Sequence, residues 1–157
     1  MIFSAKAEYG VRLMVELGRQ KGEQPTSLKA IAAAEELPLS YLEHVVAKLK
    51  KADLVMSSRG AHGGYELARA PELIPMGVVL RALEGPIAPM MCASDDPEHA
   101  TTCDRSSRCT VNLLWVRVRD AITGALDSMT LADLVPPRIS TSEPIRPTPL
   151  QGAPTRP

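Results

Sequence analysis

Three cysteines, Cys92, Cys103 and Cys109, are the side chains of this 157-residue chain with the clearest potential for chemistry. Their spacing is C-x10-C-x5-C. In a reducing compartment, an odd set of thiols indicates a metal or redox site in preference to a disulfide framework. Thiolates bind iron–sulfur clusters and zinc alike, and the plainest alternative is a set of exposed thiols in a flexible loop.

The segment that carries the cysteines, residues 86–109, is rich in Ser, Thr, Asp and Pro, so we expect a loop without a core of its own. A long helix is predicted after it, from about Val111 to Met129, which places Cys109 near the positive end of the helix. One chain offers little to cover the apolar stripe of this helix, so we expect a homodimer in which it pairs with a second copy. The stripe consists of Val111, Trp115, Val118, Ile122, Leu126 and Met129.

Helical periodicity predicts three helices in the first fifty residues. The first covers residues 4–19, and the second follows a cap at Thr26 or Ser27 and ends at Pro38. Ser40 is expected to cap the third helix. The apolar face of that third helix consists of Leu42, Val45, Val46 and Leu49. Two short helices joined by a tight turn form a helix-turn-helix.

A short hairpin is predicted after the third helix. Leu54–Ser58 and Tyr65–Leu67 are the strand candidates, and three glycines within Arg59–Gly64 permit the positive φ angles of a tight turn. A helix-turn-helix followed by such a wing predicts a winged-helix fold. Further helices are expected at Met76–Leu83 and, as a short turn, at Thr130–Val135.

A winged helix of this kind can bind double-stranded DNA, with the third helix in the major groove and the wing along the backbone. Residues 1–70 hold 10 Lys and Arg against 8 Asp and Glu, and their basic residues cluster around the third helix and the wing. A solvated charged face is the alternative. The candidate DNA contacts are Ser40, Tyr41, Glu43, His44, Lys48, Arg59 and Gly60. Lys48 is expected to meet a phosphate, and Glu43 either selects a cytosine or lies outside the contact.

Composition limits the remaining possibilities. No apolar run approaches the length of a membrane span, and charged residues interrupt the N-terminus where a signal peptide would be apolar, so we expect a cytoplasmic protein. We predict three regions: a DNA-binding domain at 1–70, a cysteine loop and dimerisation helix at 71–135, and a disordered proline-rich tail at 136–157. No base is placed beside a cysteine nucleophile, so we expect no enzyme activity.

Three stretches of the chain closely resemble the iron–sulfur cluster regulators, the IscR-like family of the Rrf2 superfamily. They are Ser40-Tyr41-Leu42-Glu43, the wing from Ser58 to Arg69, and Thr130-Leu131-Ala132-Asp133-Leu134. The resemblance covers about residues 1–135. It implies a winged-helix dimer crossed by a long C-terminal helix, with a cluster held by Cys92, Cys103 and Cys109, 2Fe–2S in preference to 4Fe–4S. It also implies a transcription regulator, a repressor in preference to an activator, that responds to iron, redox state or nitric oxide.

The chain departs from that family in two places. The first gap between cysteines is longer than usual, and Asn112 stands where cluster-supply members place a histidine. The resemblance favours Glu8 as the fourth ligand, because in some relatives a carboxylate on the first helix of the partner subunit reaches the cluster. An ion pair of Glu8 with Arg12 is the structural alternative. His99 is the second candidate and would also complete a Cys₃His zinc site. A metal-free thiol switch remains open as well.

Overall fold

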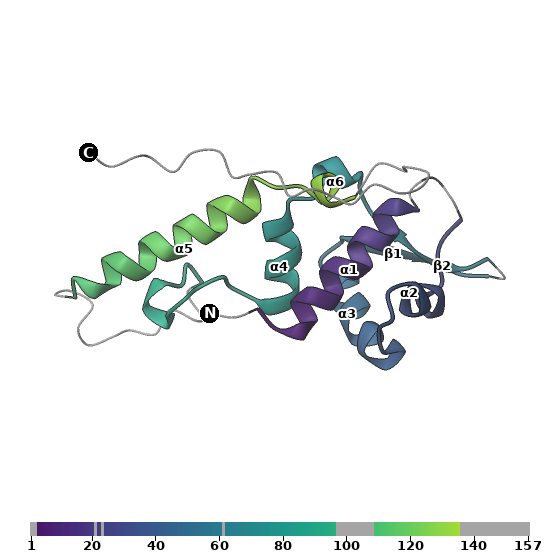
Figure 1. Ribbon diagram of the computed structural model, residues 1–157, viewed down its shortest axis with the longest axis horizontal. Coiled ribbons are helices and arrows are strands. Elements are labelled where there is room, and N and C mark those ends of the chain that lie inside the picture. Colours follow the sequence, from purple (N-terminus) through teal and green to yellow (C-terminus); the bar gives the residue numbers. More distant parts are fainter. Residues whose placement is uncertain (1–2, 21, 23, 61, 97–108, 136–157) are drawn as a thin grey trace.

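The computed structural model describes residues 3–20, 22, 24–60, 62–96 and 109–135. Within these ranges the chain is mainly helical with one two-stranded antiparallel sheet. Along the longest axis in Figure 1, a long helix projects at one end and the hairpin projects at the other. The fold class agrees with the winged-helix prediction. Cys103, His99, the wing-tip Ala61 and the predicted tail at 136–157 lie outside the described residues.

The first three helices form the helix-turn-helix and its support: α1 (Ala5–Arg19), α2 (Leu28–Ala34) and α3 (Leu39–Lys51). Ser4 caps α1 and Ser27 caps α2, in each case with the side-chain oxygen accepting a backbone N–H. The predicted Ser40 cap of α3 is wrong, because the N-cap is Pro38 and Ser40 lies inside the first turn. Proline fixes the extended backbone that precedes this helix, so a side-chain cap is not needed to start it.

The wing consists of β1 (Val55–Ser58) and β2 (Gly64–Leu67), with Val55 opposite Leu67 and Ser58 opposite Gly64. Thr26 extends this sheet through a backbone bridge to Tyr65, with N–O distances of 3.0 and 2.8 Å. A Cβ on Gly64 would meet the carbonyl carbon and oxygen of Thr26 at 2.6 Å. Only glycine therefore allows the wing to attach so closely to the segment before α2.

The main core joins the helix-turn-helix to residues well past the predicted boundary at 70. Helix α4 (Met76–Glu84) follows the 3-10 turn η1 (Pro71–Leu73), and the short α6 (Leu131–Leu134) returns to the same core. Ile74, Val79, Leu83 and Leu131 are fully buried together with apolar residues of α1 and α3. Residues 1–70 thus share their core with α4 and α6, because these elements cover the face of α1 and α3 that the helix-turn-helix leaves open.

Helix α5 (Val111–Asp127) contains no fully buried residue. Its predicted stripe is nevertheless not left entirely to a second subunit: Ile122 and Leu126 pack on a small cluster of Ala7, Leu80 and Ile87 from the same chain. The expectation that one chain offers little cover is wrong for this half of the helix, because α4 lies beside it. Among the described helices, none is both long and apolar enough to cross a membrane.

The cysteine segment is more ordered at its start than a loop without a core would be. Ile87 is 7% exposed, and Ala93 within the 3-10 turn η2 (Met91–Ala93) is 1% exposed. The prediction is wrong for these residues, because η2 packs on α5.

Candidate nucleic-acid interface and cysteine site

Helix α3 presents a polar face to solvent. Ser40, Glu43 and His44 are exposed, as predicted for residues that could reach DNA. Tyr41 is half-buried, with its ring in edge contact with Tyr9 of α1 at a centroid distance of 5.1 Å. Packing against Tyr9 fixes the Tyr41 ring, so the phenol holds the start of α3 against α1.

Lys48 has a partner that the sequence did not indicate. Its Nζ donates a hydrogen bond of 3.1 Å to the carbonyl oxygen of Leu83, near the end of α4. A cation at a helix C-terminus is stabilised by the helix dipole and by the carbonyls that lack an intrahelical donor. Lys48 therefore ties α3 to α4, a role that competes with the predicted phosphate contact.

Two further lysines share the outward face of α3 with Glu43. Lys50 and Lys51 line a shallow depression between α3 and Tyr65 of β2, and Lys50 Nζ donates to Ser57 Oγ of β1 at 2.9 Å. Basic residues were expected around the third helix, but neither Lys50 nor Lys51 was among the predicted DNA contacts. The helical spacing could have indicated them, because residues seven and eight positions after Glu43 lie on the same face of a helix as Glu43.

The wing tip carries Arg59 and Gly60, both exposed. Gly60 has a φ of +114°, which other residues rarely adopt. His62 is exposed beside them. The wing is joined to α3, because the hairpin follows this helix directly in the sequence and Lys50 of α3 donates to Ser57 of β1.

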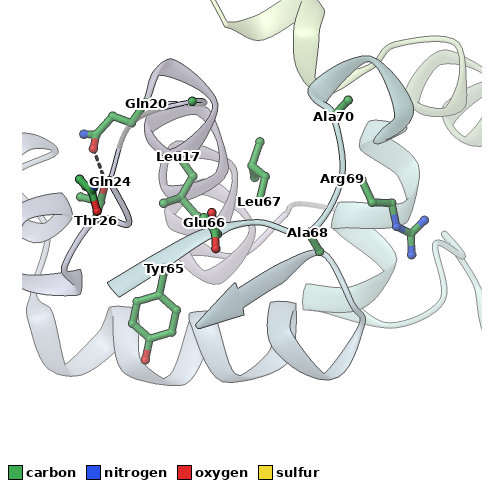
Figure 2. Close-up of a pocket in the computed structure, with 11 residues that line it drawn as sticks. Leu17, Gln20, Gln24, Thr26, Tyr65, Glu66, Leu67, Ala68, Arg69 and Ala70 are labelled. Atoms are coloured by element: carbon green, nitrogen blue, oxygen red, sulfur yellow. Dashed lines mark hydrogen bonds between the residues drawn. The ribbon is translucent and has the colours of Figure 1, made fainter. Parts of the chain in front are cut away.

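A second hollow lies on the other side of β2, at the end of α1 (Figure 2). Its volume is about 240 Å³. Gln20 and Thr26 are joined by a hydrogen bond at one side of it, and the Arg69 side chain points away from that pair. Gln20 also donates to Glu16 at 2.6 Å, so the polar groups at this wall are already satisfied by one another.

Two of the three cysteines lie in the described residues, and both are half-buried free thiols. Cys92 belongs to η2, and Cys109 directly precedes the Thr110 cap of α5. Asn112, in the first turn of α5, donates from Nδ2 to the carbonyl oxygen of Cys92 at 2.7 Å. This bond brings the backbone of Cys92 to the end of the helix that Cys109 adjoins.

A second residue of α5 holds the same turn. Arg119 donates to the carbonyl oxygen of Ala93 at 2.9 Å and forms an ion pair with Asp95. It also binds its neighbour Asp120 at 2.7 Å. Within the described ranges, no three His, Cys, Asp or Glu side chains are grouped as metal ligands. Two of the ligands predicted from the sequence, Cys103 and His99, fall outside these ranges.

Glu8 stands on the first turn of α1 with a side chain that is 65% exposed. Its Oε1 lies 3.9 Å from an Arg12 nitrogen, which is the ion pair weighed from the sequence. Arg12 binds Glu35 more closely, at 2.9 Å, and also donates to the Glu35 carbonyl. Arg12 therefore holds α1 to the turn after α2, and Glu8 is only loosely engaged within its own chain.

Comparison with known proteins decides the family. The model of the Rrf2 family, described as iron-dependent transcriptional regulators, matches residues 3–137. The chain belongs to the Rrf2 family. The HTH-type transcriptional regulator CymR of Bacillus subtilis is 43% identical over 134 residues, which are 85% of this chain and 89% of that protein.

Two solved structures agree with this assignment of the Rrf2 chain. The structure of CymR (YrzC), titled the global cysteine regulator of B. subtilis, has a TM-score of 0.69 and 43% identity, over 86% of this chain and 96% of that one. IscR of T. potens has a TM-score of 0.68 and 40% identity, over 85% of each chain. This Rrf2 protein is accordingly a DNA-binding transcriptional regulator of winged-helix fold and not an enzyme.

Proposed function

We propose that this Rrf2 protein is a homodimeric repressor whose affinity for its DNA operator is switched by an iron–sulfur cluster on Cys92, Cys103 and Cys109. The observation that carries the proposal is the hydrogen bond from Asn112 to the Cys92 carbonyl, which brings the backbone of Cys92 to the end of α5 that Cys109 adjoins. Thiolates near a helix N-terminus are stabilised by the helix dipole, and this favours an anionic thiolate-ligated group.

The DNA contacts proposed from the structure combine helix and wing. Ser40, Glu43 and His44 would enter the major groove, Lys50 and Lys51 would meet the backbone, and the remaining candidates are Tyr41, Lys48, Arg59 and Gly60. Exposure of the helix face and of the wing tip supports this arrangement. Glu43 either accepts from a cytosine amine or lies outside the contact, because a carboxylate that faces phosphates without a donor is repelled.

The donor set fits an iron–sulfur cluster as far as it is described. Cys92 and Cys109 are unpaired thiols with half-buried side chains, and thiolate sulfur is the ligand such clusters use. When bound, the cluster would supply iron–thiolate bonds that are sensitive to redox state. We favour a 2Fe–2S cluster, with 4Fe–4S as the alternative. The protein would transmit the state of the cluster through η2 and α5, which are linked by the hydrogen bonds of Asn112 and Arg119 to the backbone of η2.

Glu8 of the partner subunit is the fourth ligand we favour. Its carboxylate is largely exposed and its 3.9 Å pair with Arg12 is weak, so little within the protomer opposes another partner. A ligand from α1 of a second subunit would couple the cysteine site to the spacing of the two α3 helices. That spacing decides whether both helices reach successive major grooves.

Dimerisation is supported by a second face of α5. Val111, Leu114, Ala121 and Ala125 are exposed and, with the half-buried Val118, recur at alternating intervals of three and four residues. This interval is that of a coiled-coil seam. The seam shares Val111 and Val118 with the stripe predicted from the sequence, and its other members lie next to that stripe on the helix.

A metal-free thiol switch and a zinc site are the two alternatives to the cluster. The CymR relative is titled the global cysteine regulator, and this title does not name an iron–sulfur cluster. Anaerobic purification followed by an absorption spectrum and analysis for iron, sulfide and zinc separates the three. Visible absorbance with iron and sulfide supports the cluster. Zinc without iron contradicts the cluster and supports the zinc site, whereas a protein without metal contradicts the cluster and supports the thiol switch.

A further inference from the structure

Two neighbouring backbone carbonyls of η2 are held by two side chains of α5. Asn112 Nδ2 lies 2.7 Å from the carbonyl oxygen of Cys92, and an Arg119 nitrogen lies 2.9 Å from that of Ala93. The Arg119 side chain is only 16% exposed, whereas its partner Asp95 is 79% exposed. Arg119 is therefore buried by the turn that it binds, and its hydrogen bond to Ala93 is the more protected of its contacts.

The spacing of the two side chains fixes the direction of the turn. Asn112 and Arg119 are seven residues apart, so they lie on one face of α5 and are separated by about 10 Å along its axis. The turn consequently runs along the helix, with Cys92 on the side of Asn112. Cys109 is three residues before Asn112 in the sequence, so both thiols belong to the same end of α5.

We infer that Asn112 and Arg119 are positioning residues that place Cys92 as a thiolate ligand before any metal binds. The inference rests on the proposed thiolate site. Asn112 serves from outside the ligand set, because its nitrogen is committed to a carbonyl and its amide oxygen is a poor ligand for soft metals. Hydrogen bonds that hold a ligand residue in place before the metal binds lower the entropy lost when the ligands assemble.

The first test uses the metal-free, reduced full-length protein. Iodoacetamide labelling is followed site by site by mass spectrometry, with Cys109 as the internal reference. Asn112→Ala and Arg119→Ala should each raise the labelling rate of Cys92 by about fivefold, the equilibrium factor of one lost hydrogen bond. Arg117→Ala is the matched control, because it removes an exposed arginine two positions away on the same helix and should change nothing.

The second test uses Co²⁺ alone as the metal probe, read from its thiolate absorption band. Asn112→Ala should weaken Co²⁺ binding by about tenfold, as the loss of a hydrogen bond that orients a metal ligand does. Asn112→Asp separates the two possible roles of the residue. A carboxylate would tighten binding if position 112 were a ligand, whereas it should weaken binding here, because it removes the donor and repels the Cys92 carbonyl.

The outcomes distinguish this inference from the function on which it rests. If the wild-type protein binds neither Co²⁺ nor iron, the proposed cluster function fails, while the labelling experiment still reports whether Cys92 is held. Circular dichroism checks that the variants are folded. If Cys92 is labelled in both Asn112→Ala and Arg119→Ala at the rate found in Arg117→Ala, the positioning role is overturned. Tighter Co²⁺ binding by Asn112→Asp would also overturn it.

Discussion

At the scale of single residues, Lys48 and Lys51 differ in what they bind although both are exposed lysines of α3. Lys48 donates to the Leu83 carbonyl at 3.1 Å, whereas Lys51 lines the depression beside Tyr65. A lysine that caps another helix contributes to folding, and one that faces a groove remains available for phosphate. The two positions should therefore separate stability from DNA affinity.

We expect Lys51→Ala to weaken binding to specific and random duplexes alike and to reduce the salt slope by about one unit. Lys48→Ala should instead lower the free energy of unfolding by about 1 kcal/mol, the value of one hydrogen bond, with little change in salt slope. Thermal denaturation and fluorescence anisotropy at several salt concentrations measure both quantities. A lost salt slope in Lys48→Ala at unchanged stability would restore Lys48 as the phosphate contact.

The ends of the helices show which single-residue features can be predicted from the sequence and which cannot. The Ser27 cap was predictable, because a hydroxyl before an apolar helical run has a local function. Glu36 and Asp53 have φ values of 54° and 53° after α2 and α3, a conformation usually given to glycine. Aspartate adopts this conformation more often than most residues, whereas nothing in the side chain of Glu36 marks its turn. The fold imposes both turns because α3 and β1 must return to the core.

At the scale of elements, the wing depends on the absence of a side chain at Gly64. A Cβ there would lie 2.6 Å from backbone atoms of Thr26, which cannot move without breaking the bridge to Tyr65. Gly64→Ala should cost about 1–3 kcal/mol of unfolding free energy, as overpacking does. Hydrogen exchange should show faster exchange of the Thr26 and Tyr65 amides. Unchanged protection of these two amides would mean that the contact is easily relaxed.

The start of α1 is joined to the end of α4 through Glu84. Its carboxylate accepts from the Ser4 backbone at 3.3 Å and from the Ser4 hydroxyl, and Lys6 lies 3.5 Å away. Burial raises the pKa of Glu84, but the Ser4 hydrogen bonds and the Lys6 charge outweigh it and hold the pKa below its ordinary value of 4.5. The ionised form is thus favoured in the folded state.

A group with a lowered folded pKa stabilises the protein above its unfolded pKa, and that stability is lost as the pH falls through the folded pKa. Wild-type stability should therefore decrease below about pH 4.5, and Glu84→Gln should flatten this part of the profile. Urea denaturation between pH 3 and pH 7, about one unit apart, tests the expectation. Parallel profiles for the two proteins would show that the Ser4 and Lys6 contacts do not persist in solution.

Periodicity predicted α1, α3 and α5 from their apolar stripes, whereas the hairpin was predicted from two short strand candidates around a glycine-rich turn. The ordered turn η2 was missed for a physical reason. Its docking comes from Asn112 and Arg119, residues 20 and 26 positions away that bind backbone atoms and leave no pattern in the turn. The packing of α4 against part of α5 was missed for a similar reason. An apolar stripe predicts that a helix face is buried but does not identify the element that buries it.

At the scale of the whole molecule, the exposed seam of α5 is the surface on which we expect the second subunit. Ala121→Glu places a charge in the middle of this seam, where the protomer itself leaves the position exposed. The variant should be monomeric by analytical ultracentrifugation and retain its helical content. Leu73→Glu, at a 67% exposed position on η1, is the control and should stay dimeric. A dimeric Ala121→Glu protein would place the interface elsewhere.

The central claim joins the two ends of the molecule: the state of the cysteine site at the start of α5 changes the affinity of α3 and the wing for DNA. The most direct measurement is the Kd of one anaerobically purified protein for a duplex selected from a random library, before and after removal of its cluster. We predict that the two values differ by a factor between about 5 and 150, the range of allosteric coupling between two sites. Equal affinities in the two states, with iron and sulfide shown to be present and then removed, would contradict the claim.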